Sequence, residues 1–143
     1  MKRMNIITGI IIVVAVSIAA QSSFGQSSAG LRFTTDFDFY VQGDKFPAGN
    51  YTVEKRISAT ENNTVAIRSE DGKFRRVYML VPPSSHRTSS SAPVVTFYRY
   101  AGEYFLAEMR NPRRGFSARI SGSKREKMRA QNMTAEKVFL RAD

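Results

Sequence analysis

The chain of 143 residues contains no cysteine, no tryptophan and only one histidine. The absence of cysteine excludes disulfides, thiolate metal sites and cysteine nucleophiles. Because His86 is the only histidine, the chain has no metal site built from several histidines, and a catalytic triad would depend on this one side chain. The sequence therefore predicts no metal, no cofactor, and a fold stabilised by packing and backbone hydrogen bonds.

Long apolar segments are also lacking, apart from one of 15 residues over 6–20. This segment is shorter than the ~20 residues that a helix needs to cross the hydrocarbon core. Basic residues precede it in MKRMN, and the small residues Ser23 and Gly25 follow it, as in a secretory signal peptide. We expect residues 1–25 to be removed and the protein to be periplasmic or secreted; a retained membrane anchor is the alternative. The mature residues 26–143 would form a single domain without a membrane span.

Acidic residues are scarce, with 12 Asp and Glu against 22 Lys and Arg and a net charge of +10. Ten of the basic residues lie between Arg110 and Arg141. An excess of one sign attracts partners of the opposite sign and says little about the fold. The predicted partner is an anionic polysaccharide, a lipid headgroup or another envelope protein. Nucleic acid is not expected as a partner because the chain is predicted to be exported.

The mature chain consists mainly of short segments in which apolar and polar residues alternate, as in half-buried strands. These segments cover residues 31–41, 51–58, 64–69, 74–81, 94–101, 103–110, 116–120 and 136–142. The pattern predicts an all-β fold, an antiparallel meander of seven or eight strands, arranged as a barrel or a sandwich. A parallel α/β fold is excluded because the connections are too short for repeated crossover helices.

Turn-forming residues separate these segments. Asp71 and Gly72 suit a primed two-residue hairpin turn. Residues 82–93 are rich in serine and proline, and we expect them to form a flexible loop. This loop carries His86 beside Ser84 and Ser85, but a nucleophile needs a base that a third group holds rigidly. Catalysis is therefore not expected from the loop.

Three motifs occur in a fixed order along the mature chain. They are PAGNYTV at 47–53, YFLAE at 104–108 and SKRE at 123–126. Their order resembles that in a family of small exported bacterial β-proteins without an assigned function, in which PAG-x-Y-x-V, YFL-x-E and S-K-x-E recur. The resemblance implies an exported bacterial β-protein and brings no activity with it.

The segment SGSKREKMRAQN at 121–132 is the only one with a helical signature. Ser123 and Glu126 stand at the spacing of a capping box, which predicts a helix over 124–131. Met128 is its only large apolar residue, so we expect it to dock the helix on the sheet. Either this is a capped surface helix, or its first turn binds an anion through Lys124, Arg125 and Arg129.

Aromatic residues gather in the segments over 94–101 and 103–110. Tyr98, Arg99 and Tyr100 are candidates for an exposed aromatic surface, since aromatic side chains interleaved with basic ones suit stacked ligands. The alternative is that these residues serve the core and cross-strand pairing, which aromatic residues favour in any sheet.

Three carboxylates are candidates for acid or base catalysis. Asp36 and Asp38 lie two residues apart on one expected strand, hence on one face and about 7 Å apart. A regular strand places Glu108 on the face of Tyr104 and Leu106, opposite Glu103. Two exposed aspartates and one paired glutamate are the simpler interpretation of this pattern.

The sequence therefore favours a non-enzymatic binding or structural module of the cell envelope, with affinity for anionic partners. One alternative is a small hydrolase that uses Asp36, Asp38 or Glu108. A further alternative is a lipocalin-like carrier of a small apolar ligand, for which the length of the mature chain is tight.

Overall fold

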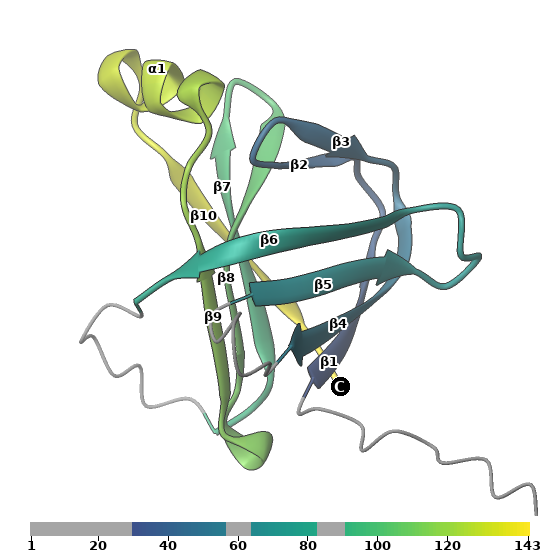
Figure 1. Cartoon of the computed structure of the whole chain (residues 1–143). Coiled ribbons are helices and arrows are strands. Elements are labelled where there is room, and N and C mark those ends of the chain that lie inside the picture. The colour runs from purple at the N-terminus through teal and green to yellow at the C-terminus, as the bar shows by residue number, and fades with distance from the viewer. Residues whose placement is uncertain (1–29, 57–63, 83–90) are drawn as a thin grey trace, which may run out of the picture.

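The computed structural model describes residues 30–56, 64–82 and 91–143. Within these ranges the chain forms ten strands, one α-helix and one 3₁₀ helix (Figure 1). The prediction of an all-β fold with one short C-terminal helix is confirmed. The elements are β1 (Gly30–Thr35), β2 (Phe39–Val41), β3 (Asp44–Phe46), β4 (Gly49–Arg56), β5 (Thr64–Ser69), β6 (Arg75–Val81), β7 (Val94–Tyr100), β8 (Glu103–Asn111), η1 (Pro112–Arg114), β9 (Phe116–Ile120), α1 (Lys124–Asn132) and β10 (Glu136–Arg141).

The predicted signal peptide lies outside the described residues, as do residues 83–90 of the predicted loop, which include Ser84, Ser85 and His86. The described residues begin at β1.

The strands form one mixed sheet in the order β1-β4-β5-β6-β9-β8-β2-β3, with β7 paired to β8 and β10 paired to β7. Neighbouring strands are antiparallel except β2 and β8, which pair in parallel where Phe39 and Tyr40 lie beside Tyr104 and Phe105. The predicted number of seven or eight strands is too low. A simple antiparallel meander is also wrong, because β2 and β3 leave β1, and β2 pairs in parallel with β8 on the edge opposite β7.

The additional strands arise because the single strand predicted over 31–41 is interrupted at residues 36–38. Asp38 holds the chain there, since its Oδ1 accepts a 3.0 Å hydrogen bond from the Ala48 amide and its Oδ2 lies 2.8 Å from Lys45 Nζ. Gln42 and Gly43 then turn the chain with φ angles of 49° and 101°. Two positive φ angles make the primed turn that joins β2 to β3.

The primed turn predicted at Asp71 and Gly72 is not formed. Of these two residues only Gly72 has a positive φ, 73°. The Ser69 amide donates to the Phe74 carbonyl oxygen at 2.9 Å, so four residues separate the paired ends of β5 and β6. The Ser69 hydroxyl donates to Asp71 Oδ1 at 2.5 Å, and the Lys73 amide donates to the same atom at 3.1 Å. These two bonds stabilise the longer loop.

The sheet curves around one core of aromatic and aliphatic side chains. Phe33 lies in contact distance of Phe39, Tyr51 and Phe97, with ring centroids 5.6 to 6.2 Å apart. Burial of such rings is the main source of stability in a cysteine-free domain. The inward-facing residues include Leu31, Phe33, Phe39, Val41, Phe46, Tyr51, Val53, Val65, Ile67, Tyr78, Leu80, Val95, Phe97, Leu106, Met109, Phe116, Ala118 and Ile120.

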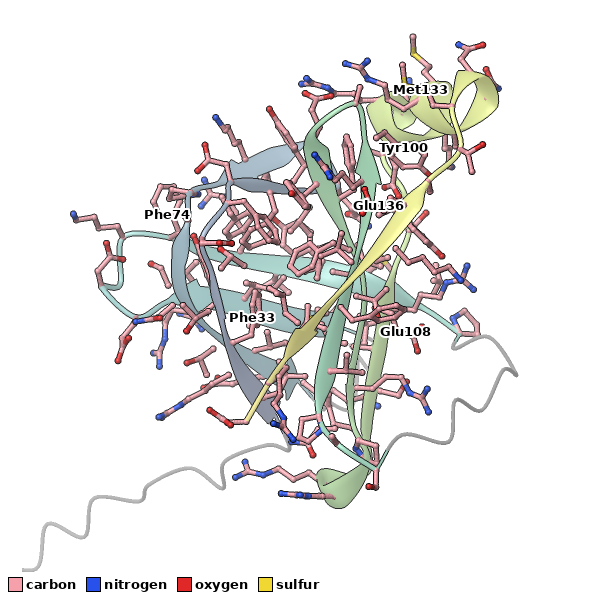
Figure 2. The ribbon with its side chains drawn as sticks, turned by 180° about the vertical axis from the view of Figure 1, so that it is seen from behind. Phe33, Phe74, Tyr100, Glu108, Met133 and Glu136 are labelled. Carbon is pink, nitrogen blue, oxygen red and sulfur yellow. The ribbon has the colours of Figure 1, made fainter. Side chains whose placement is uncertain are left out.

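The sheet is not closed by strand pairing, because the order of strands does not return to β1. The ends of β1 and β10 nevertheless converge at one end of the molecule (Figure 2). There the Arg32 amide donates to the Asp143 carbonyl oxygen at 3.0 Å, and the Asp143 amide donates to the Arg32 carbonyl oxygen at 2.9 Å. These two bonds place the residues that follow β10 beside β1.

A β-bulge changes which face of β8 each residue occupies. Phe97 pairs with Leu106 whereas Thr96 pairs with Glu108, so Ala107 is the extra residue. An extra residue reverses the alternation beyond it. The expectation that Glu108 shares a face with Tyr104 and Leu106 is therefore wrong.

Candidate functional site

Helix α1 begins where the capping box predicts. Ser123 is its N-cap, and the Ser123 hydroxyl accepts a 3.1 Å hydrogen bond from the Glu126 amide. The helix ends at Asn132, one residue beyond the predicted range of 124–131. None of its residues is buried, so α1 lies on the surface of the sheet.

Two of the three cations predicted to bind an anion are ion-paired within the protein. Arg125 and Arg129 both contact the carboxylate of Glu103, and Arg129 Nη2 lies 2.9 Å from Glu103 Oε2. The Arg125 guanidinium also lies over the Tyr40 ring, 4.8 Å from its centroid. Lys124 is exposed, and no carboxylate of the described residues lies within ion-pair distance of it. This arrangement supports a docked surface helix, with Glu103 already occupying Arg125 and Arg129.

The helix does not dock through Met128, as expected from its apolar character, because Met128 is 66% exposed. Tyr100 lies beneath α1 and is buried (Figure 2). Glu126 is half-buried at the same junction, and burial raises the pKa of its carboxyl above the ordinary value. Polar and charged side chains therefore attach the helix to the sheet, where a single apolar contact was predicted.

Tyr98, Arg99 and Tyr100 do not form one exposed surface. The Tyr98 and Tyr100 rings lie on one face of β7, 6.4 Å apart, and Tyr100 is only 6% exposed. Arg99 lies on the other face, where its guanidinium is 5.6 Å from the Tyr104 ring centroid and 3.0 Å from the Glu136 carboxylate. The three residues therefore serve packing and pairing within the sheet.

The two aspartates predicted on one strand face lie in the interruption between β1 and β2. Asp36 is exposed. The ion pair with Lys45 and then the hydrogen bond from the Ala48 amide lower the pKa of Asp38 below its ordinary value. A carboxyl that is held ionised by structural partners is suited to stabilising a turn. Asp36 and Asp38 therefore do not form the strand-borne pair that was predicted from their spacing.

Glu108 lies on the outer face of β8, where its Oε1 is 3.7 Å from Arg110 Nε. The bulge at Ala107 places it on the same face as Glu103. Its side chain is half-buried (Figure 2 labels its position). The pairing of Glu108 with a cation, which was the simpler interpretation of the sequence, is present, whereas the face that a regular strand assigns to Glu108 is wrong.

Arginines that the sequence analysis did not single out come together at the end where β1 and β10 converge. The strand register places Arg32 on β1 beside Thr52 on β4, and Thr52 beside Arg68 on β5. Neighbouring strands are about 4.8 Å apart, so the two arginines flank the threonine on the outer face of the sheet. This cross-strand set of Arg32, Thr52 and Arg68 is the basic row.

The basic row lines a cavity of about 430 Å³, which Glu70, Arg141 and Asp143 line as well. A second cavity, of about 510 Å³, shares Arg141 and Asp143 with the first. Its other lining residues include Asn111, Arg113 and Arg114. We call the arginines of the two adjoining cavities the basic site: Arg32, Arg68, Arg113, Arg114 and Arg141.

The basic site carries an excess of positive charge. Five arginines line it together with two acidic residues, Glu70 and Asp143. In the part of the chain that the structure describes, no carboxylate lies within 4.0 Å of these guanidinium groups. Guanidinium groups bind carboxylates, sulfates and phosphates through paired N–H donors. The site is therefore equipped to bind an anion from outside the chain.

Sequence spacing alone does not predict this site, because Arg32, Arg68 and Arg141 are far apart in the chain. The one signal was alternation, which places Arg32 and Arg68 on outward faces of their strands. Which outward residues become neighbours depends on strand register, and register follows from pairing across the whole sheet.

Among the described residues, no group of three or more His, Cys, Asp or Glu side chains is placed to hold a metal ion. In the same ranges no helix combines the length and the apolar character that a membrane crossing requires. The chain matches no protein-family model, no curated protein and no solved structure. Its resemblance to the exported bacterial family therefore stays a prediction.

Proposed function

We propose that the protein is a non-enzymatic, exported binding module of the cell envelope that holds an anionic partner at the basic site. The observation that carries the proposal is the pair of adjoining cavities, of about 430 and 510 Å³, that share Arg141 and are lined by five arginines without an internal carboxylate partner among the described residues. This location replaces α1 as the candidate for anion binding, because Glu103 pairs with Arg125 and Arg129.

Two further observations support a binding role at the surface. Core side chains fill the interior of the curved sheet, which supports surface binding over a carrier with an internal ligand. The carboxylates Asp38 and Glu108 each pair with a cation of the same chain, which supports structural roles for them over catalysis. Export rests on the leader at residues 1–25. Determining the N-terminus of the mature protein tests whether the leader is removed, and Gln26 is the expected first residue.

Binding of polygalacturonate to the mature protein, measured by calorimetry, tests the proposal. Because the contacts are between exposed charges, affinity should fall about tenfold or more as salt rises from about 0.05 to about 0.5 M. Neutral dextran should not bind. Binding of polygalacturonate that ignores salt would contradict the proposal, since guanidinium–carboxylate contacts at a surface must weaken with screening.

Charge variants locate the binding. Replacing Arg32, Arg68 and Arg141 by glutamine should lower the affinity about tenfold or more, since each exposed contact contributes up to about 1 kcal/mol. A matched control removes the same charge from exposed positions that line neither cavity: Arg119→Gln, Lys127→Gln and Lys137→Gln. If the two triple variants lose affinity equally, binding depends on net charge alone and the basic site is not the location.

A further inference from the structure

The basic site continues into a third cavity with different chemistry. This cavity, of about 390 Å³, shares Asn50, Tyr51 and Glu70 with the cavity that the basic row lines. Its remaining lining includes Pro47, Asp71 and the half-buried ring of Phe74. Carboxylates, an amide and an apolar ring thus replace the arginines at this end of the surface.

A second cross-strand row links the two regions. The register places Thr34 beside Asn50, and the Glu70 amide donates to the Asn50 carbonyl oxygen at 2.9 Å. The side chains are joined in the same order, since the Thr34 hydroxyl donates to Asn50 Oδ1 and Asn50 Nδ2 donates to Glu70 Oε2, both at 2.7 Å. We call Thr34, Asn50 and Glu70 the acceptor row.

The two rows lie side by side on the outer face of the sheet. Arg32 and Thr34, Asn50 and Thr52, and Arg68 and Glu70 are each two residues apart, so the rows are separated by roughly 7 Å. A ligand that crosses both rows meets guanidinium donors first and hydroxyl and carboxylate acceptors next. It therefore needs anionic groups and hydroxyl donors within a short distance of each other.

We propose that the anionic partner is an acidic oligosaccharide, a chain of sugar rings that carries carboxylates or sulfates. This inference rests on the proposed function. The acidic groups bind the arginines of the basic row, and ring hydroxyls donate to the acceptor row. Within the described residues no group donates to Glu70 Oε1, so this oxygen accepts a hydroxyl of the ligand. The C–H face of a sugar ring packs against Phe74 at the far end.

A ligand whose polar groups are all anionic, with no hydroxyl donors, fits less well. Glu70 and Asp71 would face its charged groups, and like charges at short range repel. A membrane surface fits less well for another reason. The exposed large apolar side chains of the described residues are Val77, Met79, Met128, Met133 and Phe139, and none of them lines the three cavities. A lipid headgroup at this site would have no exposed large apolar side chain beside it to enter the acyl region, since the Phe74 ring is half-buried.

The test compares three probes on the mature protein by calorimetry: oligogalacturonate, linear polyphosphate of matched charge, and phosphatidylglycerol vesicles. Two hydrogen bonds from sugar hydroxyls should make oligogalacturonate bind about tenfold more tightly than polyphosphate. Glu70→Gln and Phe74→Leu should each lower the affinity for oligogalacturonate about threefold, because the first removes a charge-assisted hydrogen bond and the second removes the contact with the aromatic ring. Glu70→Gln should raise the affinity for polyphosphate, since the variant lacks a carboxylate that repels phosphate.

The outcomes separate this inference from the proposed function. Suppose that the triple arginine variant lowers the affinity for both polyanions, that the wild type binds the two equally, and that Glu70→Gln and Phe74→Leu change neither affinity. The acidic oligosaccharide is then wrong as the partner, and the anion-binding function stands. If vesicles bind and displace oligogalacturonate, a lipid headgroup replaces it. If the triple variant binds both polyanions with unchanged affinity, both proposals are wrong. Circular dichroism and thermal unfolding of each variant show whether it is folded.

Discussion

The Tyr78 hydroxyl donates a 2.8 Å hydrogen bond to Asp44 Oδ2, and this bond joins β6 to β3. The two strands are not neighbours in the strand order of the described residues. Tyr78 is buried, and the centroid of its ring lies 6.4 Å from that of Phe46, which is on β3 like Asp44. A side-chain hydrogen bond thus joins two strands that share no backbone pairing.

Replacing Tyr78 by phenylalanine removes this bond and keeps the ring. We expect the free energy of unfolding to fall by about 1–2 kcal/mol, because the acceptor is a carboxylate. Urea unfolding at neutral pH measures the loss. Tyr98→Phe is the matched control, since among described residues the Tyr98 hydroxyl has no hydrogen-bond partner, and it should change stability by less than about 0.5 kcal/mol. Equal losses in the two variants would show that the Tyr78–Asp44 bond contributes nothing specific.

Tyrosine ionisation should destabilise the fold at high pH. Burial, with smaller contributions from the charges of Asp71 and Asp38, raises the pKa of Tyr51 from 10.0 to about 12. The folded state therefore favours the neutral phenol, and this stabilisation is complete below pH 10 and lost as pH rises from 10 to about 12. Burial also raises the pKa of Tyr78, which extends the loss to higher pH.

Free energies of unfolding measured in urea across this pH range test the prediction. The hydrogen bond with Asp38 raises the pKa of Lys45 above its ordinary value, so a second group also titrates at high pH and the comparison must be between wild type and Tyr51→Phe. The variant should lose less stability between pH 10 and 12 than the wild type does. Its stability at pH 7 should be lower by about 1 kcal/mol, because the 2.5 Å bond from the Tyr51 hydroxyl to the Pro47 carbonyl oxygen is lost. Parallel pH curves would count against this role of Tyr51.

Local signals predicted well where the structure depends on neighbours in sequence. The strand at Thr64–Ser69 and the helix after Ser123 begin where alternation and the capping box place them. The break at Asp38 was missed because it depends on contacts with Lys45 and Ala48, which alternation does not report. The pattern of apolar residues across 31–41 continues through the break, and therefore looks like one strand.

Features set by pairing between distant segments were not predictable in this way. The bulge at Ala107 reverses the faces of β8, and only the register with β7 reveals it. The basic site has the same origin, because Arg32 and Arg68 become neighbours of Thr52 through the pairing of β1, β4 and β5. The cations of α1 were predicted to bind an anion because they are close in sequence, yet Glu103 of β8 pairs with two of them.

The turn between β7 and β8 offers a stabilising change. Ala101 has a φ of 48° and Gly102 a φ of 83°, the left-handed pair of a primed turn. Alanine is strained in this region, whereas asparagine adopts it readily before glycine. Ala101→Asn should raise the free energy of unfolding by about 0.5–1 kcal/mol. Ala101→Val, which is branched at Cβ, should lower it. A loss of stability in Ala101→Asn as well would contradict the prediction that asparagine relieves strain at this position.

The two cations in the first turn of α1 should respond in opposite ways to the same substitution. Lys124→Gln removes a charge that the helix dipole disfavours, and should stabilise the helix by a few tenths of a kcal/mol. Arg125→Gln removes the same charge but also the ion pair with Glu103 and the contact with the Tyr40 ring. We expect it to destabilise the attachment of α1 by about 0.5–1 kcal/mol.

Hydrogen exchange of the α1 amides distinguishes the two cases, because the loss in Arg125→Gln is local to the helix. Exchange should accelerate there in Arg125→Gln and slow slightly in Lys124→Gln, while the amides of β5 stay unchanged in both. Glu103→Gln should reproduce the Arg125→Gln pattern, since Glu103 is the common partner of Arg125 and Arg129. If Arg125→Gln instead protects the helix as Lys124→Gln does, Arg125 acts only through the dipole, and the first turn of α1 again becomes a candidate for anion binding.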